Sequence, residues 1–505
     1  MMFRNLLSLV FLSSLGYGSE KPDLLRFENG DQLHGDFGGI EEGPAVLWKR
    51  DDVSGEVNFK TSDLRQIVLR GRRPAKALQD LSHVGTANGD RIPGRVRELN
   101  DDQIILDTQF GGEIEIPRDR VGLIAPNPMG GRVLYSGPFD QTEWLMVDRD
   151  HPQGLPIVDP ETEKEAEEGK DEAEDKSPRW KFFGSAWYWQ NKETGTGLVQ
   201  KAGMPDKAVF QCQVSWKSRI SLAIGFHSNF EIPKKEEGDE KKAPVVNRGS
   251  STNSLAEVFG ESYVLHLYSN YVVLYRTYFD ENGNPRVQRV RTSHSSVRLG
   301  DSGSAKIEIR SNRESGEIIL FVNDEFVVQW SEPTDNEEIG GGFAGKGSGF
   351  GFLVQTANSP VRISEVVVAE WNGMPDAARS LQIDESDIVL LTNGTDRFSG
   401  KVKAIKDGKL KLEGRFGDFE FPMAEVAEIR FAKNSIKKVE EMDSDSIKVR
   451  FYPIGTLTGK PVSGDSGKLQ MVSGAAGEID INLDSAVMLE FRSSGSYLDD
   501  WDTDF

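Results

Sequence analysis

A short glycine-centred phrase recurs near both ends of the chain, and it constrains the fold more than any other feature. It reads ENGDQLHG at 28–35, ANGDRIPG at 87–94 and TNGTDRFSG at 392–400. An Asn-Gly pair between apolar runs favours a type I′ turn, because both central positions of that turn need a positive φ. Each copy therefore predicts a β-hairpin at the start of a repeated unit.

The residues after each phrase repeat one order of strand patterns, and a degenerate fourth copy occupies 449–491. The spacing from the second Gly of the phrase to the first apolar residue of the closing strand is nearly constant. It is 29 from Gly35 to Leu64, 27 from Gly94 to Val121, 26 from Gly400 to Val426 and 28 from Gly459 to Val487. Constant spacing in internal copies indicates repeats of one supersecondary unit.

Each copy predicts about five short strands, and an open sheet of that size exposes its edges, so we expect a small closed barrel. The phrase N-G-D-x-x-x-G resembles that of the small Sm-like or Src-homology-like barrels of bacterial exported proteins. The copies predict two tandem pairs of barrels, at 19–72 and 80–126 and at 384–433 and 445–493. Asp31 and Asp90 either line a site or bond their own turns, and the turn role is favoured.

The composition indicates an all-β protein that does not bind nucleic acid. With 505 residues, the chain has room for about three domains. Its 52 glycines and the lack of long helical patterns suit an all-β class. The net charge of −21 opposes binding to phosphate backbones. The single cysteine, Cys212, alternates with apolar residues and predicts a buried core side chain.

The first eighteen residues predict a signal peptide. Arg4 precedes a short apolar run at 6–15, and small residues at Gly16 and Gly18 allow cleavage near Gly18. The run is shorter than the roughly 20 apolar residues that span a membrane as a helix, and we expect no transmembrane helix elsewhere. We therefore expect a periplasmic, secreted or cell-surface protein.

Residues 131–373 predict a different kind of domain. About twelve alternating strand patterns joined by meander turns are typical of a two-sheet sandwich. The polar segments 155–178 and 233–254 predict disordered inserts, and 494–505 predicts a flexible acidic tail. The expected architecture is thus a central jelly-roll sandwich flanked by the two pairs of small barrels.

Four stretches of this domain carry a family resemblance. They are SGPFDQTEWLM at 136–146, SAWYWQNKETGTGLVQKAGMPDKAVFQCQVSW at 185–216, GEIILFVNDEFVVQW at 316–330 and GFGFLVQTANSPVRISEVVVAEWNG at 349–373. They resemble the concanavalin/laminin-G-type jelly roll, and within it the bacterial 3-keto-disaccharide hydrolase-type domain. The resemblance implies a jelly-roll fold and a sugar-related activity.

A glycan site would need aromatic rings for stacking and polar groups for the hydroxyls. Two tryptophans share a strand face, one histidine extends a strand of small residues, and the next two strands add polar and aromatic groups. The candidate ligand-binding residues are Trp187, Trp189, His227, His266, Tyr268, Tyr275 and Arg276, with Tyr275 or Arg276 joining according to register. The competing interpretation is an aromatic core beneath a solvated outer face.

The sequence predicts no catalytic set, no metal site and no cofactor. The run from Gly340 to Lys346 has phosphate-loop spacing, but Gly347 follows where Ser or Thr is needed. The pattern favours an exported, non-catalytic binding protein whose partner is a glycan or an envelope protein, with the barrels as docking or spacer modules. One alternative is a hydrolase of modified disaccharides, with carboxylates at Glu261, Glu308 and Glu317 as candidates. The other is an envelope assembly scaffold.

Overall fold

The computed structural model describes residues 22–29, 31–41, 45–69, 76–128, 132–148, 154–156, 180–183, 185–190, 194–201, 203–233, 254–290, 296–332, 342–373, 384–437 and 445–491. The predicted signal peptide, the tail and most of both inserts lie outside these residues. Leu155–Pro156, at the start of the first predicted insert, forms strand β14. Within the described ranges the protein is all-β apart from one short α-helix, α2 (Ser254–Phe259), and none of its helices is long and apolar enough to cross a membrane.

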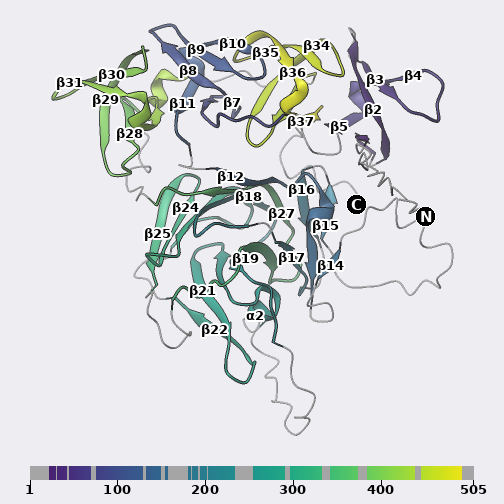
Figure 1. Ribbon diagram of the computed structural model, residues 1–505, viewed down its shortest axis with the longest axis vertical. Coiled ribbons are helices and arrows are strands. Elements are labelled where there is room, and N and C mark those ends of the chain that lie inside the picture. Colours follow the sequence, from purple (N-terminus) through teal and green to yellow (C-terminus); the bar gives the residue numbers. More distant parts are fainter. Residues whose placement is uncertain are drawn as a thin grey trace, which may run out of the picture.

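The molecule has two regions, a layer built from the four repeats and a β-sandwich beneath it (Figure 1). All described strand pairs are antiparallel, and the strands fall into one sheet network of 21 strands and two sheets of eight. The network of 21 strands is the repeat layer, and the two smaller sheets form the sandwich. The predicted two-sheet sandwich is therefore confirmed.

Each repeat contains the same set of strands. The second strand of repeat 2 is split at Gly94 into β7 and β8. The strands are β1 (Asp23–Phe27), β2 (Gln32–Glu41), β3 (Ala45–Lys49), β4 (Glu56–Lys60) and β5 (Leu64–Val68) in repeat 1; β6 (His83–Thr86), β7 (Arg91–Pro93), β8 (Arg95–Leu99), β9 (Gln103–Thr108), β10 (Gly112–Pro117) and β11 (Val121–Ala125) in repeat 2; β28 (Asp387–Leu391), β29 (Arg397–Lys406), β30 (Lys409–Gly414), β31 (Gly417–Pro422) and β32 (Val426–Arg430) in repeat 3; and β33 (Ile447–Phe451), β34 (Thr456–Asp465), β35 (Lys468–Ser473), β36 (Gly477–Asn482) and β37 (Ala486–Glu490) in repeat 4.

Within a repeat, consecutive strands pair up to the fourth, and the fifth returns to pair with the first, as β5 does with β1. A 3-10 turn joins the fourth strand to the fifth in every repeat: η1 (Thr61–Asp63), η3 (Arg118–Arg120), η6 (Met423–Glu425) and η8 (Leu483–Ser485). The second Gly of each phrase lies where the second strand crosses the third. A Cβ at Gly35 or Gly400 would collide with the backbone of that third strand, which explains the repeated glycine.

The turns of the repeated phrase differ from the predicted type I′. Asn88 does not have a positive φ, whereas Gly89 does (86°), and the N–H of Gly89 donates to the carbonyl of Thr86 at 3.0 Å. Gly394 (φ 75°) bonds Leu391 in the same way. These are type I turns followed by a left-handed glycine, the geometry of a longer hairpin loop with a bulge.

The repeats join edge to edge in an order that differs from their order in the chain. Repeat 1 pairs with repeat 4 through β5–β37 and β2–β34. Repeat 4 meets repeat 2 through β34–β7, and repeat 2 meets repeat 3 through β8–β29 and β11–β32. In Figure 1 the layer therefore runs from purple through yellow and blue to green. In place of two separate pairs flanking the sandwich, the structure has one continuous layer on one side of it.

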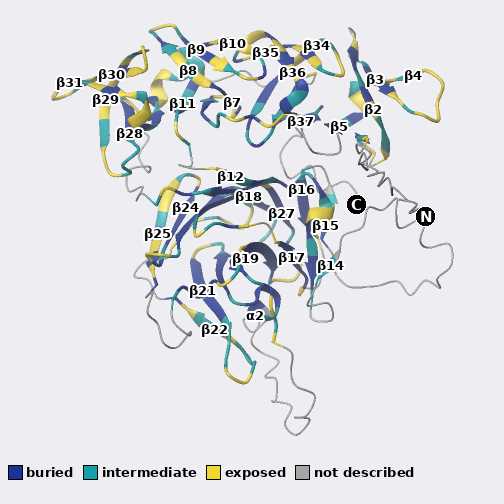
Figure 2. Cartoon of the chain, in the orientation of Figure 1, coloured by how far each residue is buried: buried dark blue, intermediate teal, exposed yellow. Residues whose placement is uncertain are grey.

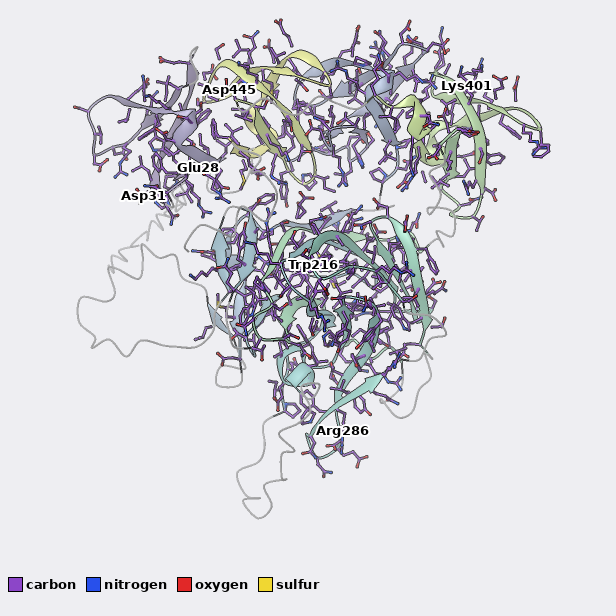
Figure 3. The ribbon with its side chains drawn as sticks, turned by 180° about the vertical axis from the view of Figure 1, so that it is seen from behind. Glu28, Asp31, Trp216, Arg286, Lys401 and Asp445 are labelled. Carbon is purple, nitrogen blue, oxygen red and sulfur yellow. The ribbon has the colours of Figure 1, made fainter. Side chains whose placement is uncertain are left out.

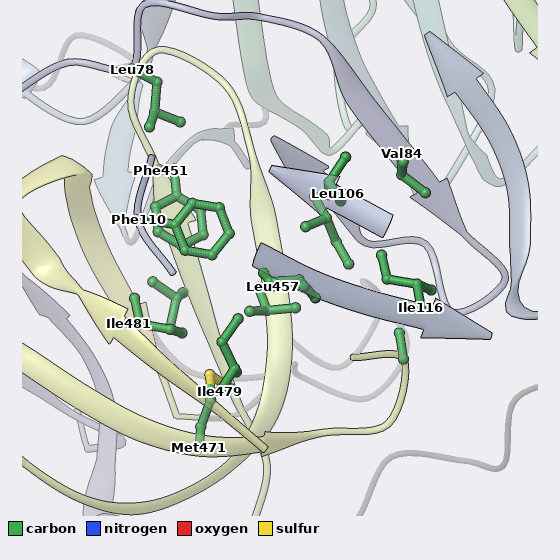
Figure 4. Packing of buried hydrophobic residues seen from close by; sticks show 14 of the residues in the cluster. Leu78, Val84, Leu106, Phe110, Ile116, Phe451, Leu457, Met471, Ile479 and Ile481 are labelled. Atoms are coloured by element: carbon green, nitrogen blue, oxygen red, sulfur yellow. The ribbon is translucent and has the colours of Figure 1, made fainter. Parts of the chain in front are cut away.

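The layer has a common hydrophobic core. One cluster contains buried side chains from all four repeats, among them Trp48, Leu106, Leu412 and Met471. At the junction of repeats 2 and 4, the rings of Phe110 and Phe451 stack with their centroids 4.2 Å apart (Figure 4). The repeats are thus built around one another's apolar side chains.

The sandwich consists of two sheets, which we call proximal and distal according to their distance from the layer. The proximal sheet contains β12 (Val133–Gly137), β15 (Lys181–Phe183), β16 (Ala186–Trp189), β18 (Lys207–Trp216), β23 (Gly303–Asn312), β24 (Glu317–Val322), β25 (Glu325–Ser331) and β27 (Val361–Glu370). The distal sheet contains β13 (Leu145–Val147), β14, β17 (Gly197–Gln200), β19 (Ser221–Ser228), β20 (Ser262–Tyr268), β21 (Val272–Phe279), β22 (Pro285–Arg289) and β26 (Gly349–Val354).

The core of the sandwich lies between its sheets and is separate from that of the layer (Figure 2). Trp216 and Phe210 of β18 belong to it, and Trp216 is labelled inside the sandwich in Figure 3. Cys212 lies in the same cluster and is 1% exposed, which confirms its prediction as a core residue. Helix α2 covers part of the distal sheet's outer face with Leu255 and Phe259, in a second small cluster.

The layer contacts the outer face of the proximal sheet and its edges. Phe139 packs against a small apolar cluster of repeats 1 and 4 that includes Val68 and Met488. The Ser185 hydroxyl donates to Glu490 Oε1 at 3.4 Å. Apolar and polar contacts together therefore attach the repeats to the sandwich.

Candidate functional site

The two tryptophans predicted to stack on a ligand are core residues. Trp187 and Trp189 are 0% exposed and belong to the main cluster of the sandwich. The Trp189 ring lies 5.3 Å from that of Trp180, and the Trp187 ring 5.0 Å from that of Phe182, between centroids. Alternation placed both rings on one strand face correctly, but that face is the interior one. Neither ring can stack on a ligand at the surface.

His227 is also buried, because a bulge in β19 turns it inward. Its φ is 51°, and the pairing of β19 with β26 shifts register between Phe226 and Ser228. Its Nε2 lies 2.8 Å from Ser311 Oγ, inside the sandwich. Burial, followed by the charge of Arg313, lowers the pKa of His227 well below its ordinary value. The small residues before it in β19 leave no open groove, since Phe259 of α2 packs against Gly225.

Arg276 points to the opposite side of β21 from Tyr275. Its Nη1 lies 3.0 Å from Glu332 Oε2, and its Nε donates to Gln288 Oε1 at 2.9 Å. The hydroxyl of Tyr263 donates to the same Glu332 oxygen at 3.0 Å. Arg276 is therefore part of a buried ion-pair network and is 7% exposed.

The remaining three predicted residues do come together on the outer face of the distal sheet. His266 Nδ1 lies 2.9 Å from the hydroxyl of Tyr268, and their rings stack with centroids 4.0 Å apart. The Tyr275 ring lies 6.4 Å from that of His266. His266 Nε2 lies 3.0 Å from Ser221 Oγ on the neighbouring strand. The pairing of His266 with Ala223 and of Val264 with Tyr275 brings these three strands into register.

Tyr271 completes this group and was not among the residues predicted from the sequence. It lies just before β21, and its ring stacks on that of Tyr268 with centroids 4.4 Å apart. Tyr271 is 46% exposed and is one of the few large hydrophobic residues exposed in the described ranges. We call Ser221, His266, Tyr268, Tyr271 and Tyr275 the tyrosine platform. A sequence signal existed, the phrase YSNY at 268–271, but only the folded hairpin shows that its two rings stack.

The platform is better suited to binding than to proton transfer. Burial lowers the pKa of His266 to about 4, so the imidazole is neutral near pH 7. A neutral imidazole donates through one nitrogen and accepts through the other, so it can link Ser221 and Tyr268 in one hydrogen-bonded chain. A general base works best with a pKa near the operating pH. Tyrosine rather than a carboxylate lies at its second nitrogen, so His266 is a weak base for activating Ser221.

The three carboxylates considered for a hydrolase do not form a pair. Glu308 is 1% exposed and bonds Arg310 at 2.7 Å on the proximal sheet. Glu317 accepts from Gln329 at 2.6 Å, and Glu261 from Asn229 at 3.3 Å beside the distal sheet. Among the residues that the structure describes, no group of three or more His, Cys, Asp or Glu side chains could hold a metal ion.

Comparisons with known proteins give similarity at the level of the fold. No protein-family model and no curated protein sequence matches the chain. The carbohydrate-binding module CBM66 from Bacillus subtilis is 11% identical; the match covers 38% of this chain and 92% of that one, with a TM-score of 0.24. The Emp46p carbohydrate recognition domain is 12% identical over 48% of this chain and 97% of its own, with a TM-score of 0.27.

An enzyme is among the similar structures too. The carbohydrate esterase vb_24B_21 from bacteriophage phi24B is 9% identical, and the match covers 48% of this chain and all of that one (100%), with a TM-score of 0.26. Binding modules and an enzyme thus share the likeness, which concerns the fold alone. What this chain binds has to follow from its own side chains.

Proposed function

We propose that this chain is a non-catalytic glycan-binding protein and that the tyrosine platform holds the sugar. The observation that carries the proposal is the half-exposed ring of Tyr271, which stacks on the ring of Tyr268. Hydrogen bonds hold Tyr268 in turn. Tyr268 is fixed by its bond to His266, and His266 by its bond to Ser221. The ring is therefore presented to solvent in one orientation before a ligand arrives.

Such a surface suits a sugar for two reasons. Sugar rings carry apolar C–H faces that pack on tyrosine rings, and tyrosine hydroxyls hydrogen-bond sugar hydroxyls at little cost in conformational entropy. Arg289, which is opposite Tyr275 in the pairing of β21 with β22, is exposed and adds a charged donor at the edge. A platform with aromatic faces and a polar edge matches both parts of a saccharide.

We further propose that the protein is exported, with cleavage near Gly18, and that the four repeats are small barrel units that dock or space the sandwich. The strand order of each repeat, in which the fifth strand returns to the first, supports a curled unit. An envelope glycan or protein would then be the partner that the layer or the platform meets.

The test is a glycan-binding screen of the full chain against the Tyr271→Ala variant. We expect the wild type to bind a defined set of glycans and Tyr271→Ala to lose at least about tenfold in affinity, a typical cost for a stacking ring. Phe326→Ala is the matched control, because Phe326 of β25 is an equally exposed aromatic, at 46%, on the proximal sheet. Loss of binding in both variants, or in neither, would contradict the proposal.

A second candidate function is hydrolysis, which the Ser221–His266 contact of 3.0 Å favours. Ser221→Ala distinguishes the two, since binding loses one of the hydrogen bonds that anchor the platform, whereas hydrolysis loses its nucleophile. We expect Ser221→Ala to keep glycan binding to within about threefold, as for the loss of one modest hydrogen bond. Turnover of a bound glycan by the wild type that disappears in this variant would assign the protein as an enzyme.

A further inference from the structure

A pocket lies between the repeat layer and the outer face of the proximal sheet. Its volume is about 150 Å³, the space of roughly five water molecules. The turn that opens repeat 2 contributes Gly89, and the corresponding turn of repeat 4 contributes Gly455. Two copies of the repeated turn thus meet over the sandwich. The charged side chains that line the pocket are Arg91, Lys448 and Arg450 from the repeats and Lys306 and Glu365 from the sheet.

Two of the four cations already have acidic partners. Arg450 Nε lies 2.7 Å from Glu490 Oε1, and its Nη1 lies 3.5 Å from Glu365 Oε1. Lys306 Nζ lies 2.8 Å from an oxygen of Asp324.

The other two cations, Arg91 and Lys448, are different. Within the described ranges, neither makes an ion pair or a side-chain hydrogen bond, and both are half-buried. A half-buried cation loses part of its hydration. Both cations act on the Glu365 carboxylate by charge without an ion pair, and Lys448 acts in the same way on Glu490 and Asp90. Within the described residues, the pocket therefore holds two positive charges that have no direct ion-pair or side-chain hydrogen-bond partner.

The pKa of Glu365 indicates that the electrostatic potential in this pocket is positive. Burial would raise the pKa of its carboxyl, but the charges of Arg450, Arg91, Lys448 and Arg362 outweigh burial and hold the pKa below its ordinary value. Its side chain is still 58% exposed. The whole chain carries a net charge of −21, so a local excess of positive charge is not a property of its general surface. It belongs to this pocket.

We propose that this pocket is a binding site for a small oxyanion group, a carboxylate, sulfate or phosphate, held by Lys448 and Arg91. Guanidinium and ammonium groups pair with such oxygens through short charge-assisted hydrogen bonds. The site is separate from the tyrosine platform, which lies on the other sheet of the sandwich. It does not depend on the proposed glycan function.

Because the pocket lies where two repeats meet the sandwich, a bound ligand stabilises that junction. Arg91 comes from repeat 2, Lys448 from repeat 4 and Glu365 from the sandwich. A bound oxyanion neutralises charges that otherwise repel one another across this junction. It stabilises the folded arrangement by mass action, because the unfolded chain has no such pocket.

The experiment measures binding of sulfate, phosphate and glucuronate to the full chain by calorimetry and thermal unfolding, with chloride at equal ionic strength as reference. Low millimolar concentrations keep the general salting effect of sulfate small. We expect at least one probe to bind and to raise the melting temperature. Lys448→Gln and Arg91→Gln should each weaken binding about tenfold, the cost of a charged hydrogen bond. Lys401→Gln, an exposed lysine in repeat 3 (Figure 3), is the matched control and should leave binding unchanged.

Glu365→Gln gives a change in the opposite direction. Removing the carboxylate deletes a like charge beside the ligand, so affinity for the oxyanion should rise about threefold or more. A gain of affinity cannot come from misfolding, which protects the test if Lys448→Gln is unstable. Glucuronate alone as the binding probe would assign a sugar acid, and sulfate or phosphate alone would assign an inorganic or ester oxyanion. The proposal is overturned if no probe binds, or if Lys448→Gln and Glu365→Gln bind as Lys401→Gln does.

Discussion

The sandwich and the repeat layer bury their hydrophobic cores in opposite ways. The sandwich buries its core with strands from one continuous stretch, β12 to β27. The layer buries its core with strands from both ends of the chain, and its neighbours in space are repeats 1 and 4, 4 and 2, and 2 and 3. The four repeats thus share one hydrophobic cluster instead of each enclosing its own.

The size of the repeat explains this difference. Domains of about 60 residues bury only a modest fraction of their surface and are marginal on their own. Each repeat is shorter than that, with five strands, or six in repeat 2, of three to ten residues. Four repeats that share one cluster reach the size of an ordinary domain, which the sandwich has by itself.

The largest difference between the sandwich and the layer is expected when residues 380–505 are removed. We expect the sandwich, 131–373, to stay folded, because its core contains only its own side chains. Repeats 1 and 2 should lose their structure, since repeat 1 would lose the pairing of β5 with β37 and Phe110 of repeat 2 would lose the stacked ring of Phe451. Limited proteolysis with mass spectrometry of the fragments measures both outcomes. A protected fragment 19–126 would show that the first pair folds independently.

A second test compares a ring in each core. Phe110→Ala in the layer and Phe210→Ala in the sandwich each remove a buried ring, at a cost of about 3–5 kcal/mol. Because the cores are separate, urea unfolding should show two transitions, with Phe110→Ala lowering only that of the layer and Phe210→Ala only that of the sandwich. Equal shifts of both transitions in either variant would mean that the two regions unfold as one.

A third test concerns the contact between repeats 2 and 4. Asp90 accepts from the N–H and the hydroxyl of Thr458 at 2.8 and 2.7 Å, and it is 2% exposed. Asp90→Ala leaves both donors of Thr458 without their partner and should cost about 1–3 kcal/mol in urea unfolding. Asp90→Asn can accept from the Thr458 N–H through its oxygen and donate from its NH2 group to the Thr458 hydroxyl, which then acts as acceptor, so it should cost much less at neutral pH.

The pH dependence of these variants has a definite sign. Burial raises the pKa of Asp90 above its ordinary value of 3.8, although the bonds from Thr458 oppose the rise. The folded protein therefore holds the proton more tightly than the unfolded chain, and the contribution of Asp90 to stability falls as pH rises through the folded pKa. The stability of Asp90→Asn relative to wild type should increase from about pH 3 towards neutral pH. A decrease over that range would mean that the ionised form is the favoured one.

The smallest effect is expected at the equivalent position in repeat 1. Asp31 is exposed, and it bonds Asn29 of its own turn at 2.7 Å (Figure 3). Asp31→Ala should change the free energy of unfolding by less than about 0.5 kcal/mol, as is usual at the surface. A loss as large as that of Asp90→Ala would indicate that Asp31 also makes a contact between repeats.

The sequence predicted the local features well, because those depend on neighbouring residues. The Asn-Asp pair at 323–324 forms a tight turn with positive φ at both positions, 52° and 64°, a conformation that these two residue types tolerate. The Asn-Gly-Asp phrase marks hairpins, and Asp31 bonds within its turn as the favoured interpretation held. His266, Tyr268 and Tyr275 share the predicted face because strand alternation has a period of two.

The interior face of a strand and its distant partners could not be predicted from the sequence, for physical reasons. Alternation sorts side chains into two faces but does not say which face is interior, so Trp187 and Trp189 were assigned to the wrong environment. A single bulge at His227 reversed the face of that side chain. The edge partners of a strand depend on the other end of the chain, so the link between Asp90 and Thr458 and the pocket formed by Arg91 and Lys448 left no local signal.

The interleaving of the repeats also delays strand pairing during synthesis of the chain. The backbone N–H of Arg91 donates to the hydroxyl of Thr456, 365 positions further along the chain. At roughly 5–20 residues per second, synthesis reaches the second partner about 20–70 s after the first. During that interval repeats 1 and 2 have unsatisfied strand edges and uncovered apolar faces. The strand edges of repeats 1 and 2 that pair with repeat 4 therefore have no partner until the last repeat has been synthesised.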